Sequence, residues 1–143
     1  VVVTEDYGDN QDAKVHRSRG YNVFNDNIHI VILVDGGSAS ASEIFAGAMQ
    51  EYGKARLVGT KTFGKGSVQE LVQVTDTTSL KVTVARWLTP KGNSISNGGL
   101  TPDVEVPIEA KDIEDGMDPQ LDRAVEILLE EPNILISNTE NPL

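Results

Sequence analysis

The sequence contains no cysteine among its 143 residues. This absence excludes disulfide bonds, thiolate metal ligands and a cysteine nucleophile. The sequence also lacks an apolar run near the roughly 18–20 residues that a membrane-spanning helix needs, and its first residues lack the basic and apolar regions of a secretory signal. The composition, with 38% hydrophobic and 24% charged residues, therefore predicts a globular domain or part of one.

Basic residues are scarce in the last third of the chain. Residues 101–143 contain twelve acidic side chains and only two basic ones, Lys111 and Arg123, whereas residues 1–100 contain ten of each kind. An acidic surface without a cluster of Lys and Arg repels phosphate backbones. We therefore expect no nucleic-acid partner.

The central part of the chain predicts a strand that leads through a glycine turn into a helix. Residues 28–34 are nearly all apolar and mostly β-branched, which is typical of a strand covered on both faces in a parallel sheet. After Gly36 and Gly37, apolar residues at helical spacing predict an amphipathic helix from about residue 41 that ends at Gly53. We expect the strand to be central in its sheet. We expect the helix to pack against this sheet through Ile44, Phe45, Ala48 and Met49.

The remaining segments give further local predictions. Residues 55–58 are a short strand candidate, and residues 67–74 and 80–88 predict a hairpin with one buried face. Residues 90–107 are rich in Gly, Asn, Ser and Pro, and we expect them to cross the surface as a long connection. Asp118 and Pro119 predict the start of a helix that ends near residue 131, and residues 132–143 are expected to be a flexible tail. This helix is predicted to present an apolar stripe formed by Leu121, Ala124, Val125, Leu128 and Leu129.

Ser40 is the first candidate for chemistry. It lies where the predicted strand turns into the helix, so that helix amides beside it would favour a developing negative charge. However, Ser40 and Glu43 also match the Ser-x-x-Glu capping box, which needs no catalysis to explain it. From this motif alone, both a cap and a nucleophile remain open, and the cap is favoured.

A serine nucleophile needs a base, and neither histidine is well placed to be one. His29 lies inside the predicted strand and His16 lies in a polar stretch without a motif, which disfavours a Ser-His-Asp triad. Lys65 is the other route, because a desolvated lysine amine can act as a general base. The flanking Gly64 and Gly66 would let its backbone approach another element closely. The alternative is that Lys65 is an ordinary loop lysine in solvent.

Two stretches of the sequence together resemble one enzyme family. Residues 37–50 read GSASASEIFAGAMQ, and residues 59–69 read GTKTFGKGSVQ. In residue type and spacing these stretches resemble the carboxy-terminal processing peptidases, also called tail-specific proteases. Residues 80–83, 99–104 and 118–121 resemble the family's continuation, so the resemblance covers about residues 28–129.

The resemblance implies a partial α/β core of the ClpP/crotonase-like kind, a mixed sheet with packed helices, and a serine endopeptidase that uses a Ser/Lys dyad. Ser40 corresponds to the nucleophile and Lys65 to the general base, while Gln69 matches the residue that orients the lysine in many members. The backbone amide of Ala41 corresponds to one oxyanion donor. Glu51 stands where some members have an aspartate, so it is a candidate supporting acid.

The resemblance also implies how the chain relates to a whole enzyme. Residues 1–143 correspond to the C-terminal part of one peptidase core domain, without the PDZ domain and the glycine-rich strand that members carry upstream. We therefore expect weak or no activity from this chain alone. The implied substrates are proteins with unstructured C-terminal tails, and the implied location is the bacterial cell envelope or periplasm. No metal or cofactor is implied, and an exposed sheet edge is expected to allow self-association.

Two non-catalytic alternatives remain open. One is a binding domain of the same fold, like the retinoid-binding repeats that resemble this family. The other is a scaffold in which Ser40 only caps a helix. The presence of Ser40, Lys65 and Gln69 together favours the enzyme.

Overall fold

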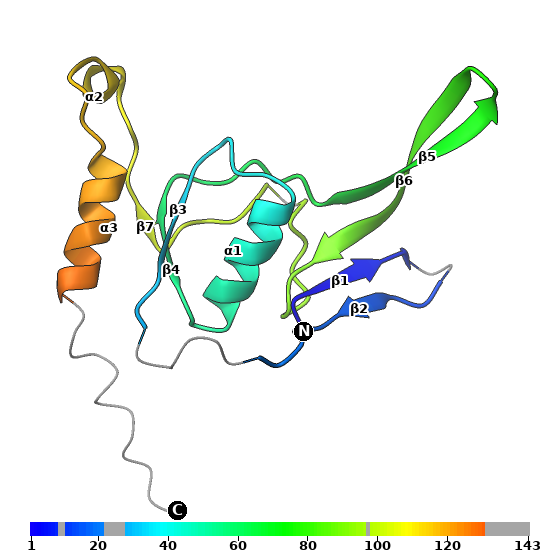
Figure 1. The fold of residues 1–143 in the computed structure, drawn as a ribbon, viewed down its shortest axis with the longest axis horizontal. Coiled ribbons are helices and arrows are strands. Elements are labelled where there is room, and N and C mark those ends of the chain that lie inside the picture. The colour runs from blue at the N-terminus through cyan, green and yellow to red at the C-terminus, as the bar shows by residue number, and fades with distance from the viewer. Residues whose placement is uncertain (9–10, 22–27, 97, 131–143) are drawn as a thin grey trace, which may run out of the picture.

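The structure is a computed structural model that describes residues 1–8, 11–21, 28–96 and 98–130, and it places two sheets and three helices within them (Figure 1). The larger sheet is antiparallel, with the strand order β2-β1-β6-β5. Its strands are β1 (Val3–Asp6), β2 (Lys14–His16), β5 (Ser67–Thr75) and β6 (Thr78–Leu88). The smaller sheet is parallel, with the order β3-β4-β7. Its strands are β3 (Val31–Val34), β4 (Arg56–Gly59) and β7 (Val104–Glu105). The predicted mixed α/β class is confirmed.

Two helices cover the parallel sheet. Figure 1 shows α1 (Ala41–Glu51) on one side of its strands and α3 (Pro119–Glu130), preceded by the short α2 (Ala110–Glu114), on the other. Successive residues of a strand point to opposite faces, and the neighbours Leu57 and Val58 in β4 are both 0% exposed. Both faces of the sheet are therefore buried at β4. One buried cluster joins Val34, Ala46 and Leu57.

The predicted strand over residues 28–34 is present, but it is shorter and it is not central. It begins at Val31, and it pairs with β4 alone among the described strands. The central strand of this sheet is β4, which has β3 on one side and β7 on the other. Leu33 in β3 is 40% exposed. An apolar β-branched run predicts burial on average, but it does not predict the position of a strand in the sheet.

Helix α1 occupies the predicted residues, and its predicted packing face is confirmed at Ala48, which is buried, but not at Phe45. Phe45 is 55% exposed, whereas the small residues Ala46, Gly47 and Ala48 are buried. A Cβ atom on Gly47 would lie 3.3 Å from the side chain of Leu100, so the helix approaches that segment as closely as a glycine allows. The predicted contact of Phe45 with the sheet is wrong, because close packing selects the small residues of the helix.

The predicted hairpin is confirmed in its pairing but not in its burial. Strands β5 and β6 pair in antiparallel register up to Thr75 and Thr78, which flank a two-residue turn. Figure 1 shows the far half of this hairpin projecting from the body of the molecule. Leu71 is 73% exposed, and Val74 and Leu80 are exposed as well. Alternating apolar residues therefore predicted the strands correctly, although nothing in the described chain covers them there.

The connection over residues 90–107 is not simply a surface segment. Ile95 is 1% exposed and Pro102 is buried, and the segment includes strand β7. Its Gly and Pro content correctly predicted irregular backbone. The packing of this backbone against the rest of the core is a tertiary property that composition does not encode.

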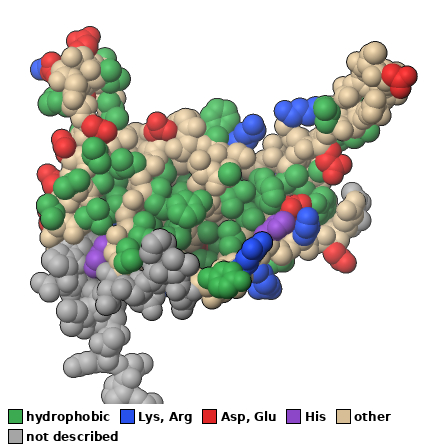
Figure 2. Space-filling view, viewed as in Figure 1, with side chains coloured by type: hydrophobic (Ala, Val, Ile, Leu, Met, Phe, Trp, Pro, Cys, Tyr) green, Lys and Arg blue, Asp and Glu red, His purple; other side chains and the backbone are tan. Residues whose placement is uncertain are grey.

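Helix α3 starts where the sequence predicts, and the Leu121 N–H donates to the Asp118 carboxylate at 3.0 Å. Its buried residues are Gln120, Ala124 and Ile127. The predicted stripe is therefore wrong except for Ala124, and Figure 2 shows exposed hydrophobic side chains over this helix with acidic ones among them. Gln120 can be buried because its amide donates to the Val106 carbonyl at 2.8 Å. The expected tail, residues 132–143, lies outside the described residues.

None of the helices in the described ranges is both long and apolar enough to cross a lipid bilayer.

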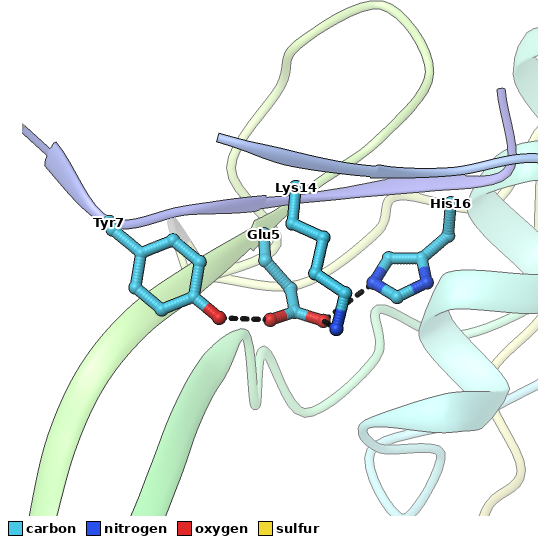
Figure 3. A network of polar contacts seen from close by, with 4 residues as sticks. All are labelled: Glu5, Tyr7, Lys14 and His16. Atoms are coloured by element: carbon cyan, nitrogen blue, oxygen red, sulfur yellow. Dashed lines mark hydrogen bonds and ion pairs between the residues drawn. The ribbon is translucent and has the colours of Figure 1, made fainter. Parts of the chain in front are cut away.

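A polar network fastens β1 to β2. The Glu5 carboxylate accepts the Tyr7 hydroxyl, contacts His16 Nε2 at 2.5 Å and lies 3.7 Å from Lys14 Nζ (Figure 3). The bond from Tyr7 does most to lower the pKa of Glu5. Burial acts in the opposite direction, whereas the bond from His16 and the charge of Lys14 lower the pKa further. The ring of His16 also lies 6.0 Å from that of Trp87 in β6.

This network predicts a pH-dependent contribution to stability. A carboxylate with a lowered pKa in the folded state stabilises the fold above its unfolded pKa, near 4.3 for glutamate, and loses this effect as the pH falls through the folded value. We expect Glu5→Gln to lower the free energy of unfolding by about 1–3 kcal/mol at neutral pH. This difference from wild type should shrink below about pH 4.

Urea denaturation of the intact protein across this pH range measures the effect. Glu105→Gln, which changes an exposed carboxylate of β7, is the control. A Glu5→Gln effect that stayed the same from neutral to acid pH would contradict the assigned cause.

Candidate active site

The turn that joins β3 to α1, residues 35–40, has an unusual backbone at Ser40. The Asp35 carboxylate accepts the N–H groups of Gly37 and Ser38 at 2.9 and 3.0 Å, and this fixes the first part of the turn. Ser40 follows with φ 57° and ψ −116°, and within the described residues it is the one non-glycine residue with a positive φ. Such a conformation costs about 1–3 kcal/mol and is concentrated at functional sites.

The strain is not a requirement of helix capping. N-cap residues usually have extended backbone, and Glu109, the N-cap of α2, has φ −89° and ψ 160°. Ser40 forms the predicted capping box with Glu43, whose carboxylate accepts the Ser40 N–H at 2.9 Å. Both helices thus have a capping box, but only the Ser40 turn is strained. The cap is confirmed, and it leaves the conformation of Ser40 unexplained.

Glu43 connects the Ser40 turn to the loop that contains Lys65. The Glu43 carboxylate is completely buried. Its Oε2 atom accepts the N–H groups of both Ser40 and Lys65, each at 2.9 Å. The two nitrogens therefore lie no farther apart than twice that distance. This places two sequence-predicted residues, separated by 25 positions, side by side at the backbone level.

Other hydrogen bonds hold the Lys65 loop, residues 60–66, along the same turn. The Thr60 N–H donates to the Val34 carbonyl at 2.9 Å, and the Phe63 N–H donates to the Ser38 carbonyl at 3.0 Å. The Lys65 side chain itself is exposed. The loop backbone is thus fixed next to the Ser40 turn, and the lysine side chain is exposed.

The two glycines that flank Lys65 allow the loop to lie on the segment over residues 95–99. A Cβ atom on Gly64 would lie 2.7 Å from the Gly99 nitrogen, and one on Gly66 would overlap the Ser96 backbone. Gly64 also has φ +88°. The predicted close approach of the backbone around Lys65 is confirmed, and the partner is the connection that we expected to lie on the surface.

The structure does not bring all candidate residues together. Ala41 is the first residue of α1 and is exposed. Because it lies in the first turn of the helix, its N–H has no intrahelical acceptor. The Gln69 amide lies on β5 and donates to the Thr83 hydroxyl at 3.5 Å. Its expected role in orienting Lys65 stays a prediction.

Glu51 lies at the other end of α1, about 16 Å along the helix axis from Ser40 at 1.5 Å per residue. Its carboxylate accepts the Thr89 hydroxyl at 2.6 Å, the Lys91 N–H at 2.7 Å and the Asn93 amide at 2.8 Å. Burial raises the pKa of Glu51, but these three bonds and the charge of Lys91 outweigh it, so that the pKa is lowered. The structure thus places this acid on the turn after β6 and not beside Ser40.

Thr62 is a further residue of the site that sequence reasoning missed. The Thr62 hydroxyl donates to Glu43 Oε1 at 2.5 Å and accepts the Leu100 N–H at 2.7 Å. A threonine in a polar loop carries no signal for such a role. The motif around Glu43 predicted only a cap, because complete burial of its carboxylate depends on a loop that follows much later in the chain.

His16, the alternative base, is bound to Glu5 in the larger sheet.

Comparisons with known proteins identify a family. The family model described as "Peptidase family S41" matches residues 1–106. The carboxy-terminal-processing protease of Bartonella bacilliformis is 49% identical over 77 residues, which are 54% of this chain and 18% of that protein.

Two solved structures resemble the chain as well. The photosystem II D1 C-terminal processing protease is 44% identical, with a TM-score of 0.52 over 54% of this chain and 20% of that one. The tricorn protease is 30% identical, with a TM-score of 0.65 over 73% of this chain and 10% of that one.

These matches define the class as a peptidase family, and the described part of the chain has a mixed α/β core. The chain belongs to peptidase family S41. It spans less than a fifth of the length of the curated relative from Bartonella.

The close approach at Gly64 leads to a prediction about stability. Gly64 and Gly92 have similar positive φ angles, +88° and +84°, but a Cβ atom on Gly92 would meet nothing within 4 Å. We expect Gly92→Ala to cost only the backbone strain, about 1–2 kcal/mol. Gly64→Ala should cost about 1–3 kcal/mol more, because its Cβ atom must displace the backbone of Gly99. Urea denaturation of both variants compares the costs. Equal destabilisation by the two substitutions would show that the Lys65 loop is not in tight contact with the backbone of Gly99.

Proposed function

We propose that the intact protein is a serine endopeptidase in which Ser40 is the nucleophile and Lys65 the general base. The observation that carries this proposal is the strained Ser40 turn held beside the Lys65 loop through one oxygen of Glu43. Family membership and the names of the relatives support the same activity. The fold proposed for the complete core is of the ClpP/crotonase-like kind.

In the proposed reaction, the neutral amine of Lys65 accepts the proton of the Ser40 hydroxyl as Oγ attacks the carbonyl carbon of a peptide bond. The exposed N–H of Ala41, at the start of α1, donates to the oxyanion that forms. The protonated amine then gives its proton to the leaving nitrogen, and the peptide bond breaks. The same amine, neutral again, takes a proton from a water molecule whose oxygen attacks the acyl carbon. The ester bond to Ser40 then breaks, and the amine returns this proton to Ser40 Oγ.

The exposure of Lys65 bears on this mechanism. An amine in contact with water prefers its protonated form, and burial shifts this preference towards the neutral base. Lys65 is exposed in the described structure. The proposed reaction therefore takes place with the lysine side chain shielded from water.

The proposed substrates are protein chains with unstructured C-terminal tails, and the name of the relative from Bartonella supports processing at the carboxy terminus. The proposed location is the bacterial cell envelope or periplasm. Strand β5 lies at the edge of its sheet in the described part of the chain, and an unpaired edge can bind a second strand. Self-association through this edge remains part of the proposal.

A binding domain of the same fold is the second candidate. It would need neither a strained serine nor a lysine at this position. Labelling by a serine-directed fluorophosphonate separates the two functions, because only an activated serine reacts rapidly. Labelling that disappears in both Ser40→Ala and Lys65→Ala supports the enzyme. An unlabelled protein that binds peptides would support the binding domain.

The dyad leads to a prediction about four variants of the intact protein. Ser40→Ala and Lys65→Ala should each lower kcat by at least about 10³-fold, and the double variant should lose little more, because the two residues act as a unit. Lys65→Arg should fail as well, since guanidinium does not lose its proton near neutral pH.

Cleavage of a fluorogenic tail peptide measures these rates. Lys61→Ala, at an exposed lysine of the same loop, is the control and should retain activity. Substantial turnover by Lys65→Arg would rule out the lysine as base.

A further inference from the structure

Glu43 makes more hydrogen bonds than a helix cap needs. Its Oε1 accepts the Thr62 hydroxyl at 2.5 Å and the Gly64 N–H at 2.7 Å, and its Oε2 accepts the N–H groups of Ser40 and Lys65, each at 2.9 Å. The residue is 0% exposed. Every one of these four donors comes from the Ser40 turn or the Lys65 loop.

The capping box of α2 shows what capping alone requires. There the Asp112 carboxylate accepts the Glu109 N–H at 2.8 Å, and α2 has no buried residue. Complete burial of a carboxylate is costly unless hydrogen bonds replace the lost water. Capping therefore accounts for one of the four bonds of Glu43 and for none of its burial.

The two carboxylate oxygens of Glu43 bind different donors. Oε2 binds Ser40 and Lys65 together, so a single atom sets the spacing of these two backbone segments. Oε1 is fixed by Thr62, whose hydroxyl is itself held by the Leu100 N–H at 2.7 Å. Thr62 thereby prevents the carboxylate from rotating and ties the arrangement to the core.

We propose that Glu43, held by Thr62, is the positioning residue that aligns Ser40 with Lys65, an inference that rests on the proposed function. Glu43 contacts the backbones of both residues and not the substrate. A misplacement of about 1 Å can cost about 10²-fold in rate. Loss of the alignment should therefore lower kcat and leave KM nearly unchanged.

Glu43→Gln is the first test. It keeps the size of the side chain but replaces one acceptor oxygen by an NH₂ group that must face N–H or O–H donors. We expect kcat for a fluorogenic tail peptide to fall by about 10²-fold, with KM within about threefold of wild type. The rate of fluorophosphonate labelling of Ser40 should fall in parallel, because this reaction does not depend on peptide binding.

Thr62 provides a conservative pair of variants. Thr62→Val keeps the shape but removes the hydroxyl, and it should lower kcat at least about tenfold by the same loss of alignment. Thr62→Ser keeps the hydroxyl and should restore activity to near wild type. The control is Asp112→Asn, which weakens the capping box of α2 and should reduce stability without changing kcat.

The outcomes separate the inference from the proposed function. The inference is overturned if folded Glu43→Gln keeps kcat within about threefold of wild type, or if Thr62→Val is as active as Thr62→Ser. If Glu43→Gln does not fold, the Thr62 pair decides alone. If Ser40→Ala itself retains full activity, then the proposed function has failed and Glu43 has no dyad to align.

Discussion

The buried carboxylate of Glu43 constrains the arrangement of much of the structure around it. Removal of a carboxylate from water is costly, and the cost is offset only while every oxygen keeps its donors. Here the donors come from the start of α1 and from the Lys65 loop. If the Lys65 loop moved away, Oε1 would lose both of its donors and Oε2 would keep only the Ser40 N–H. The two segments are therefore expected to form together or not at all.

This constraint explains the placement of several glycines. The Lys65 loop must lie close enough to α1 for its N–H groups to reach Glu43, while its other side lies on residues 95–99. A Cβ atom on Gly66 or Gly99 would overlap backbone or side-chain atoms of the facing segment, and one on Gly59 would overlap the Val34 carbonyl. Only backbone without side chains fits between these layers. The glycines are required by the close packing around the carboxylate as much as by local turns.

Part of the structure could be predicted from the sequence because it depends on local signals. The strand, the glycine turn and helix α1 follow from signals within a few residues, and so do the cap at Asp118 and the pairing of the hairpin strands. The faces that become buried depend on distant segments. Phe45 looks like a core residue in its helix, yet the close approach of Leu100 selects Gly47 for the packing side.

The candidate site likewise contains residues that a local motif predicts and residues whose role depends on distant contacts. Ser40 and Lys65 could be identified because the residues around each form a motif, and the resemblance to a family assigned their roles. Thr62 could not be identified, because its hydroxyl acquires its role only when Leu100 and Glu43 lie on either side of it. Glu51 was placed near the site by analogy, but an acid at the end of a helix binds whatever lies at that end, here Thr89 and Asn93.

Ser40 shows how one short motif can serve two purposes. Glu109 and Ser40 both begin helices with a capping box, yet only Ser40 adopts a positive φ. The bond from its N–H to Glu43 stabilises the very conformation that the serine side chain disfavours. The other donors to Glu43 hold its carboxylate in place. The hydrogen bonds from the Lys65 loop therefore help to maintain the strained backbone of Ser40. In the capping box of α2 no residue of the helix is buried, and there the N-cap Glu109 has the ordinary extended backbone.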